Sequence, residues 1–300
     1  MPTVLIHEVG MRDGLQVEQA IVPIERKFAW IEALVASGVD VVQAGSFVNP
    51  AVVPQMADTD AVFRHFNGRR TGKTRLSALV LNEKGLDRGL AAGVTFFCMG
   101  VSASDTHSRK NTGLGTADAM TRVLGAARRA VDAGVTVQLS VQSAFGCGYE
   151  GAIPMSRVLE MAQLYLDAGF RTVSLADTAG HATPDRVKMV FERLMTSAPD
   201  ASFACHFHDA YGLAMANACA ALEMGVRSFE TAFAGLGGCP FTAVASGNLC
   251  TEDFVHMLQM QHLRTDIDLA PLVDLAREAE AFFERLLPGN VYRVGARQCQ

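Results

Sequence analysis

The stretch VTVQLSVQSAFGCGYEGAIPMSRVLEMAQLYLDAGFRTVSLADTAG, residues 135–180, holds one full repeat of the pattern that decides the fold. Its two ends, 135–141 and 172–176, are short runs rich in β-branched and apolar residues, which is typical of strands. Between them, 155–168 has apolar residues at helical spacing and ends before Gly169. Because a helix separates the two strands, we expect them to pair in parallel as a β–α–β unit.

The same unit recurs along the chain, and helical spacing also marks 26–37, 117–133 and 185–196. The strand-like runs are 4–9, 39–47, 76–81, 95–101, 135–141, 172–176, 202–208 and 228–234. No G-x-G-x-x-G follows the first run and no P-loop occurs, which argues against an open nucleotide-binding sheet. Eight strand–helix units therefore predict an α/β fold, a closed (β/α)8 TIM barrel.

The segment after the eighth unit predicts additional helices. Residues 269–287 have the spacing of one or two helices, which we expect to pack against the barrel. No linker, low-complexity segment or charge block marks a second domain. We expect a single domain over 1–300, with the barrel in 1–265 and a helical extension and tail in 266–300.

Composition excludes several classes of protein. Hydrophobic residues make up 49% and charged residues 19% of the chain, so it can bury a large core and is not disordered. A net charge of −5 lacks the basic excess of a nucleic-acid-binding protein. No apolar run approaches the roughly 20 residues that span a bilayer, and the N-terminus has no secretory signal, so we expect a cytoplasmic protein without membrane contact. The seven cysteines, never spaced C-x-x-C, indicate free thiols in a reducing compartment.

Unusual polar residues gather where the predicted strands end, which is the face of a TIM barrel that carries the reactive groups. Arg12 and Asp13 follow the first run, and Asp177 follows the sixth. The others are His206 and His208 at the seventh run, Cys239 and Asn248 after the eighth, and Ser46 and Asn111 after two further runs. This arrangement predicts one active site on that face.

The HFHD stretch points to a metal. Residues two apart on a strand share a face, so His206 and His208 project together, into the barrel if their neighbours face the helices. An isolated H-x-H is more often a core or surface pair, but Asp13 and Asn248 offer oxygen ligands at matching strand ends. Two nitrogens, a carboxylate and an amide oxygen with open positions suit Mg²⁺ or Mn²⁺ better than Zn²⁺.

Two further residues keep alternative interpretations. Cys239, in the glycine-rich GLGGCP, is an apolar filler, a nucleophile or a proton donor; no base is visible beside it, which weakens the nucleophile. A thiol with an ordinary pKa of about 8.5 is mostly protonated at neutral pH and can protonate an enolate. Arg12 forms a simple ion pair with Asp13, or it donates to a developing enolate oxygen.

At this point the chain resembles the 3-hydroxy-3-methylglutaryl-CoA lyase family, over nearly its whole length. The motifs are EVGMRDGLQ (8–16), SFVNPAVVPQMAD (46–58), SLADTAG (174–180), CHFHDAYGLAMAN (205–217) and GLGGCPFTAVASGNLCTED (235–253). R-D-G-x-Q and H-x-H indicate the wider superfamily of metal-dependent lyases and Claisen-condensing enzymes. The cysteine loop and the S-F-V-x-P stretch indicate the lyase branch.

The resemblance implies a single TIM-barrel lyase domain, a homodimer that needs Mg²⁺ or Mn²⁺. It would cleave the Cα–Cβ bond of an acyl-CoA of the 3-hydroxy-3-methylglutaryl-CoA type to acetyl-CoA and a 3-oxoacid, acetoacetate for the usual substrate. The implied metal ligands are Asp13, His206, His208 and Asn248. The implied catalytic residues are Arg12, Cys239 and Asp177, and we expect Gln16, Gln43, Ser46 and Asn111 to contact the substrate.

Some positions depart from the family pattern. The chain has QAGSF where the family typically has a glutamate, so Gln43 cannot carry charge, and we expect Gly45 to enlarge the pocket. Phe241 replaces the usual tyrosine. The alternatives are therefore a lyase for citramalyl-CoA or a prenylated glutaryl-CoA, a Claisen-condensing synthase, and a barrel that binds acyl-CoA without turnover. Cys299 resembles a C-terminal thiol of related lyases, with a redox role or a simple tail as the two interpretations.

Overall fold

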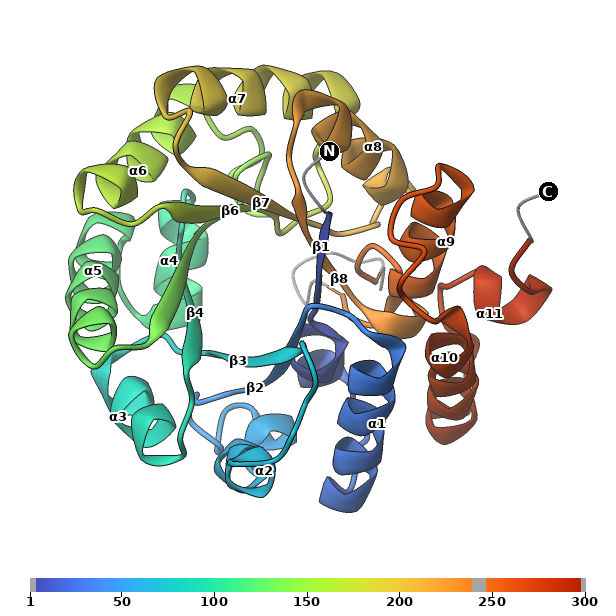
Figure 1. The fold of residues 1–300 in the computed structure, drawn as a ribbon. Helices are drawn as coiled ribbons and strands as arrows, with labels where there is room; N and C mark the ends of the chain where they lie inside the picture. Colours follow the sequence, from blue (N-terminus) through green and yellow to red (C-terminus); the bar gives the residue numbers. More distant parts are fainter. Residues whose placement is uncertain (1–3, 239–246, 298–300) are drawn as a thin grey trace.

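The structure, a computed structural model, describes residues 4–238 and 247–297, which form a closed barrel of parallel strands in the order β1 to β8. Figure 1 looks along the barrel, with the strands at the centre and helices around them. The strands are β1 (Leu5–Glu8), β2 (Val41–Ser46), β3 (Arg75–Leu79), β4 (Phe96–Ser102), β5 (Thr136–Gln142), β6 (Thr172–Asp177), β7 (Ser202–Phe207) and β8 (Ser228–Thr231). The predicted TIM barrel is confirmed, and the bounds of each strand lie within three residues of its predicted run.

Helices alternate with the strands and cover the outside of the barrel (Figure 1). They are α1 (Ile24–Ser37), α2 (Thr59–Phe66), α3 (Glu83–Ala91), α4 (Asp105–Thr112), α5 (Thr116–Asp132), α6 (Met155–Asp167), α7 (Pro184–Ser197), α8 (Ala214–Met224), α9 (Thr251–Met260), α10 (Leu269–Phe283) and α11 (Val291–Val294). None of the helices in the described part of the chain is long and apolar enough to cross a membrane.

The predicted C-terminal helices are present and pack on the barrel. After α9, the helix α10 lies against α1, where Trp30 is fully buried. The indole meets Phe282 and Phe283 of α10 edge-on, with ring centroids 5.9 and 6.3 Å apart, and meets Phe233 on the barrel side at 5.6 Å. Aromatic edge-to-face packing of this kind joins the extension to the barrel core. The division of the chain at 265 stays a prediction.

The layer between barrel and helices is apolar, and it sets the direction of the β7 histidines. Cys205 and Phe207 belong to the buried core, and Phe207 meets Phe145 with ring centroids 5.8 Å apart. Since neighbouring strand residues alternate, His206 faces the inside of the barrel, as predicted.

The inside of the barrel, by contrast, is polar below the strand ends. His7 of β1 bonds Ser77 of β3 at 2.8 Å, and Gln138 of β5 donates to Glu230 of β8 at 2.7 Å. TIM barrels usually fill this space with bulky branched side chains. Short and polar side chains here leave a cavity of about 370 Å³.

Candidate active site

The cavity opens at the carboxyl ends of the strands, and most residues predicted for the site line it. Its polar lining consists of Arg12, Asp13, Gln16, Gln43, Cys98, His107, Asn111, Gln138, Ser140, Gln142, Thr178, His206, His208 and Glu230. Its apolar lining includes Val17, Val48, Val53, Leu79, Leu81, Met99 and Ala176. A polar inner end beside an apolar wall suits a ligand with a charged head and a long arm.

Arg12 and Asp13 enter the site from a wide helical turn, Gly10–Gly14, directly after β1. The guanidinium bonds the carboxylate of Asp13 through one amino group and the side-chain oxygen of Gln43 through Nε. Gln16 donates to the same Asp13 oxygen, Oδ1, at 3.0 Å. The Arg12 guanidinium is therefore fixed by Gln43 of β2 and by Asp13 of the same turn. The other oxygen of Asp13, Oδ2, faces the two histidines.

His206 and His208 converge on that second oxygen of Asp13. Their Nε2 atoms lie 3.7 and 3.4 Å from Oδ2 of Asp13, and the two ring centroids are 4.9 Å apart. One ligand atom from each of the three residues lies within 4.8 Å of the others, and all three side chains are buried. Such an array of two imidazoles and a carboxylate can hold a divalent cation.

Asn248 contacts the same oxygen of Asp13 as the two histidines. Its amide nitrogen donates to Oδ2 of Asp13 at 3.0 Å and to the carbonyl oxygen of Leu236 at 3.0 Å. Its oxygen, Oδ1, is buried and has no partner among the described residues. A buried acceptor without a donor is costly, so a cation at this point would satisfy it. The donor set therefore fits the predicted metal.

The electrostatics of the array follow from burial and charge together. Burial alone would raise the pKa of Asp13, but Arg12 and the two imidazoles outweigh burial and hold that pKa well below its ordinary value. Burial would lower the pKa of His206, but Glu230 and Asp13 raise it on balance. Asp13 is thus a carboxylate across the physiological pH range, as a metal ligand must be.

The residues predicted to contact substrate divide into two groups. Gln16, Gln43 and Asn111 line the cavity. Ser46 lies outside the described lining; it is buried, and its hydroxyl has no partner among the described residues. Its backbone N–H lies 3.3 Å from the hydroxyl of Thr59 on α2. The contact of Ser46 with substrate stays a prediction.

Asp177 also lies outside the described cavity lining. Its buried carboxylate accepts from the backbone N–H groups of His181 and Ala182 at 2.8 and 3.0 Å. The adjacent Thr178 does line the cavity, and its carbonyl oxygen lies 3.0 Å from Nδ1 of His208. Asp177 therefore holds the loop that begins at Thr178, and its catalytic role stays a prediction.

The expectation that Gly45 enlarges the pocket is wrong. A Cβ at Gly45 would lie 2.6 Å from the hydroxyl oxygen of Thr59 on α2, so the missing side chain faces that helix. The pairing of β2 with β3 shifts by one residue between Gln43 and Gly45. Such an irregularity breaks the alternation of faces, which is why Gln43 lines the cavity while Gly45 serves packing.

Sequence reasoning missed Glu230, a buried residue that lines the cavity. Burial would raise the pKa of Glu230, but the contact with His206 outweighs burial and lowers it to about 2. A charged residue inside the strand run SFETAF was the available signal, since an inward-facing carboxylate needs a partner.

Two predicted residues, Cys239 and Cys299, lie outside the described residues, as does Phe241. Gly238, which directly precedes Cys239, lines the cavity.

Comparison with known proteins gives matches over almost the whole chain. A family model described as HMGL-like matches residues 3–278. A hydroxymethylglutaryl-CoA lyase of Bacillus subtilis is 36% identical, with 97% of each chain covered. An (R)-citramalyl-CoA lyase of Chloroflexus aurantiacus is 35% identical, with 98% of this chain and 96% of the relative covered.

Solved structures agree with these matches. The B. subtilis HMG-CoA lyase superimposes with a TM-score of 0.93 at 35% identity, covering 98% of each chain. An HMG-CoA lyase from Acinetobacter baumannii, solved with coenzyme A and 3-methylmalate, gives 0.92 at 33% identity, covering 99% of this chain and 97% of that one.

Proposed function

The chain belongs to the HMGL-like family and is a carbon–carbon lyase, and from this premise we propose that it cleaves 3-hydroxy-3-methylglutaryl-CoA to acetyl-CoA and acetoacetate. The observation that carries the proposal is the buried array of Asp13, His206, His208 and Asn248 at the end of an acyl-sized cavity. We further expect the protein to be a cytoplasmic homodimer.

The array would bind Mg²⁺ or Mn²⁺ through two imidazole nitrogens, a carboxylate and the unpartnered amide oxygen of Asn248. A bound divalent cation supplies Lewis-acid polarisation of substrate oxygens. The two oxygen ligands and the lack of thiolates among the described members of the set favour these cations over zinc.

The chain's own residues would carry the remaining chemistry. A base takes the proton of the 3-hydroxyl, the Cα–Cβ electrons pass to the thioester as an enolate, and Cα is then protonated to give acetyl-CoA. Arg12 has five N–H donors, and its bonds to Gln43 and Asp13 fix the guanidinium while other donors remain for the enolate oxygen. Cys239, which follows the cavity-lining Gly238 in the sequence, or a water that it directs, would donate a proton to Cα.

An acyl-CoA fits the shape of the cavity. Val48, Val53 and Leu81 form an apolar wall, and Asn111 on α4 lies at the same cavity. The pantetheine arm would run along this wall, with the exposed Lys110 of α4 available to the anionic end of coenzyme A. The complex of the A. baumannii relative with coenzyme A supports this ligand class.

Citramalyl-CoA is the second candidate substrate, because one relative of similar identity is an (R)-citramalyl-CoA lyase. Gln43 is neutral where the resemblance implies a negatively charged glutamate, so the cavity beside Arg12 carries less negative charge. This difference could change which acyl group the cavity accepts, and citramalyl-CoA should therefore be tested. The same set of assays should include a prenylated glutaryl-CoA as substrate, and the condensing reaction of acetyl-CoA with a 2-oxoacid.

The test is a steady-state assay of the full chain with 3-hydroxy-3-methylglutaryl-CoA, Mg²⁺ or Mn²⁺ and a reducing agent. We expect acetyl-CoA and acetoacetate in equal amounts, abolished by EDTA and reduced at least about 100-fold in Cys239→Ala, as for loss of a general acid. Turnover of citramalyl-CoA without turnover of 3-hydroxy-3-methylglutaryl-CoA would mean that citramalyl-CoA is the substrate. No turnover of any thioester in the panel would contradict the lyase assignment.

A further inference from the structure

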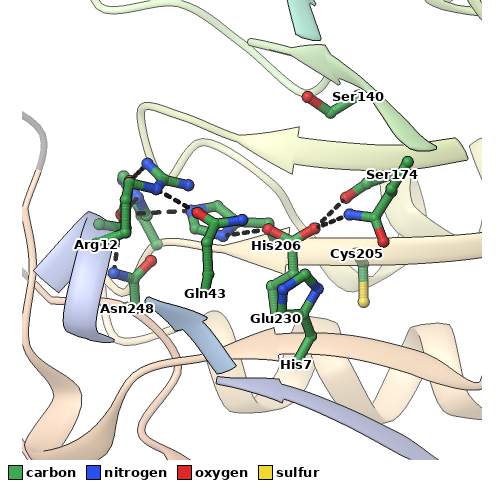
Figure 2. A network of polar contacts seen from close by, with 12 residues as sticks. His7, Arg12, Gln43, Ser140, Ser174, Cys205, His206, Glu230 and Asn248 are labelled. Atoms are coloured by element: carbon green, nitrogen blue, oxygen red, sulfur yellow. Dashed lines mark hydrogen bonds and ion pairs between the residues drawn. The ribbon is translucent and has the colours of Figure 1, made fainter. Parts of the chain in front are cut away.

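The two imidazoles of the candidate metal site face different oxygen atoms at Nδ1. Nδ1 of His208 lies 3.0 Å from the backbone carbonyl oxygen of Thr178. Nδ1 of His206 lies 3.1 Å from Oε2 of Glu230, an ion-pair contact without the alignment of a hydrogen bond, and Figure 2 shows this pair inside a buried polar network. In both rings Nε2 faces Asp13. An acceptor at Nδ1 favours the tautomer that carries its proton there.

Glu230 is itself fixed by donors on the far side. Its other oxygen, Oε1, accepts from Nε2 of Gln138 at 2.7 Å and from the hydroxyl of Ser174 at 2.9 Å. Figure 2 shows Ser174 on one side of the Glu230 carboxylate and His206 on the other. The two donors come from β5 and β6, so a carboxylate on β8 joins three other strands of the barrel. With Oε1 held in this way, Oε2 is left for the imidazole.

We propose that Glu230 is a positioning residue of the metal centre. By accepting from Nδ1 of His206, it keeps the proton on that nitrogen and leaves the lone pair of Nε2 for the cation. The inference rests on the proposed metal site and adds to it a carboxylate–histidine pair that neither H-x-H nor R-D-G-x-Q contains. Partners of this kind fix the tautomer and orientation of metal-binding histidines and raise their basicity.

The competing state explains why an acceptor is needed. If the neutral ring of His206 carried its proton on Nε2, the proton would point toward Oδ2 of Asp13, which lies 3.7 Å away. That arrangement would block the nitrogen that a cation needs. Glu230 at 3.1 Å is the closer acceptor and biases the ring against this state.

The tautomer can be measured without metal. Nitrogen NMR of ¹⁵N-labelled, metal-free protein, at a pH above which the ring nitrogen shifts no longer change, should show protonated Nδ1 and unprotonated Nε2 in both histidines. Glu230→Met removes the acceptor with a side chain of similar length. In this variant we expect His206 to shift toward the Nε2–H tautomer. His208, held by a backbone carbonyl, should not change and serves as the internal control.

Metal affinity gives the second measurement. Titration with Mn²⁺ followed by calorimetry should show binding about 10- to 100-fold weaker in Glu230→Met than in the parent chain. Glu230→Gln keeps an acceptor oxygen without the charge and should recover part of the affinity. The matched control is Ser174→Ala, which removes a donor to Glu230 but leaves the carboxylate, and should bind Mn²⁺ nearly as the parent does.

Two results would overturn the inference: an Nε2–H tautomer of His206 in the parent chain, or an unchanged tautomer and Mn²⁺ affinity in folded Glu230→Met. If Glu230→Met does not fold, the parent tautomer and the affinity of Glu230→Gln decide instead. Failure of the parent chain to bind Mn²⁺ contradicts the proposed metal site itself, and the metal-free NMR result still decides the role of Glu230.

Discussion

Gln43 stands where the sequence resemblance implies a glutamate, and its contact with Arg12 makes this difference testable. The amide oxygen of Gln43 accepts from Nε of Arg12 inside the cavity. A carboxylate in its place would hold the guanidinium by a charge-assisted bond, which is about twice as strong as a neutral one. We therefore expect Gln43→Glu to raise kcat/KM for 3-hydroxy-3-methylglutaryl-CoA several-fold.

Gln43→Ala is the matched control, because it releases Arg12 and should lower kcat/KM by about tenfold. Steady-state kinetics with 3-hydroxy-3-methylglutaryl-CoA and citramalyl-CoA measure both variants. If Gln43→Glu gains nothing on the first substrate while the parent chain is active on another acyl-CoA, Gln43 determines specificity instead.

At the scale of the element, the position of Asn248 depends on a glycine after β8. Gly237 has a φ of +118°, and a Cβ there would lie 2.3 Å from the amide nitrogen of Asn248. We expect Gly237→Ala to displace Asn248 from Asp13 and to weaken Mn²⁺ binding at least tenfold in calorimetry, since one metal ligand moves. The positive φ adds a backbone cost of about 1 kcal/mol.

Gly134→Ala separates these two effects. Gly134 also has a positive φ, +79°, but nothing lies within 4 Å of the position of its Cβ. This variant should lose comparable stability and keep the Mn²⁺ affinity of the parent. Equal Mn²⁺ affinity in Gly237→Ala and Gly134→Ala would mean that the contact with Asn248 does not place the ligand.

Which parts of the site could be predicted from the sequence also depends on the elements. Asp13 and His206 were identifiable because they stand at strand ends, and parallel strands in a barrel bring all such ends to one face. Gly45 was misread because a register shift in β2 breaks the alternation on which face assignments depend. Glu230 was overlooked because one charge within an apolar strand run shows its partner only in three dimensions.

For the whole molecule, the repeat of strand and helix was enough to predict the barrel, because eight parallel strands with crossover helices close in few ways. The depth of the cavity was not predictable in the same manner. The cavity is lined by single inward side chains on separate strands, such as Leu79 of β3, Cys98 of β4 and Ser140 of β5. None of these is unusual in its own strand, and only the closed barrel brings them to one cavity.

Glu8, a buried carboxyl between β1 and the segment after β8, should contribute less to the stability of the fold as pH rises. Glu8 accepts from the N–H groups of Gly10 and Phe233 through one oxygen, and its other oxygen has no partner among the described residues. Burial raises the pKa of Glu8 from 4.5 to about 8. The folded state therefore keeps a proton that the unfolded chain releases near pH 4.5.

The sign follows from linkage: where the unfolded state binds fewer protons, the free energy of unfolding falls with rising pH, by up to about 1.4 kcal/mol per pH unit for one group. The contribution of Glu8 is complete below about pH 4.5 and is lost as pH rises through about 8.

Glu8→Gln keeps an acceptor oxygen and cannot ionise. We expect it to match the parent chain near pH 5 and to exceed it by up to about 3 kcal/mol at pH 7. Urea unfolding of both metal-free proteins from pH 5 to pH 7 measures the difference in their free energies of unfolding. Groups other than Glu8 titrate alike in both proteins, so their effects cancel in this difference. A gap that does not change with pH would show that Glu8 is ionised in the folded state.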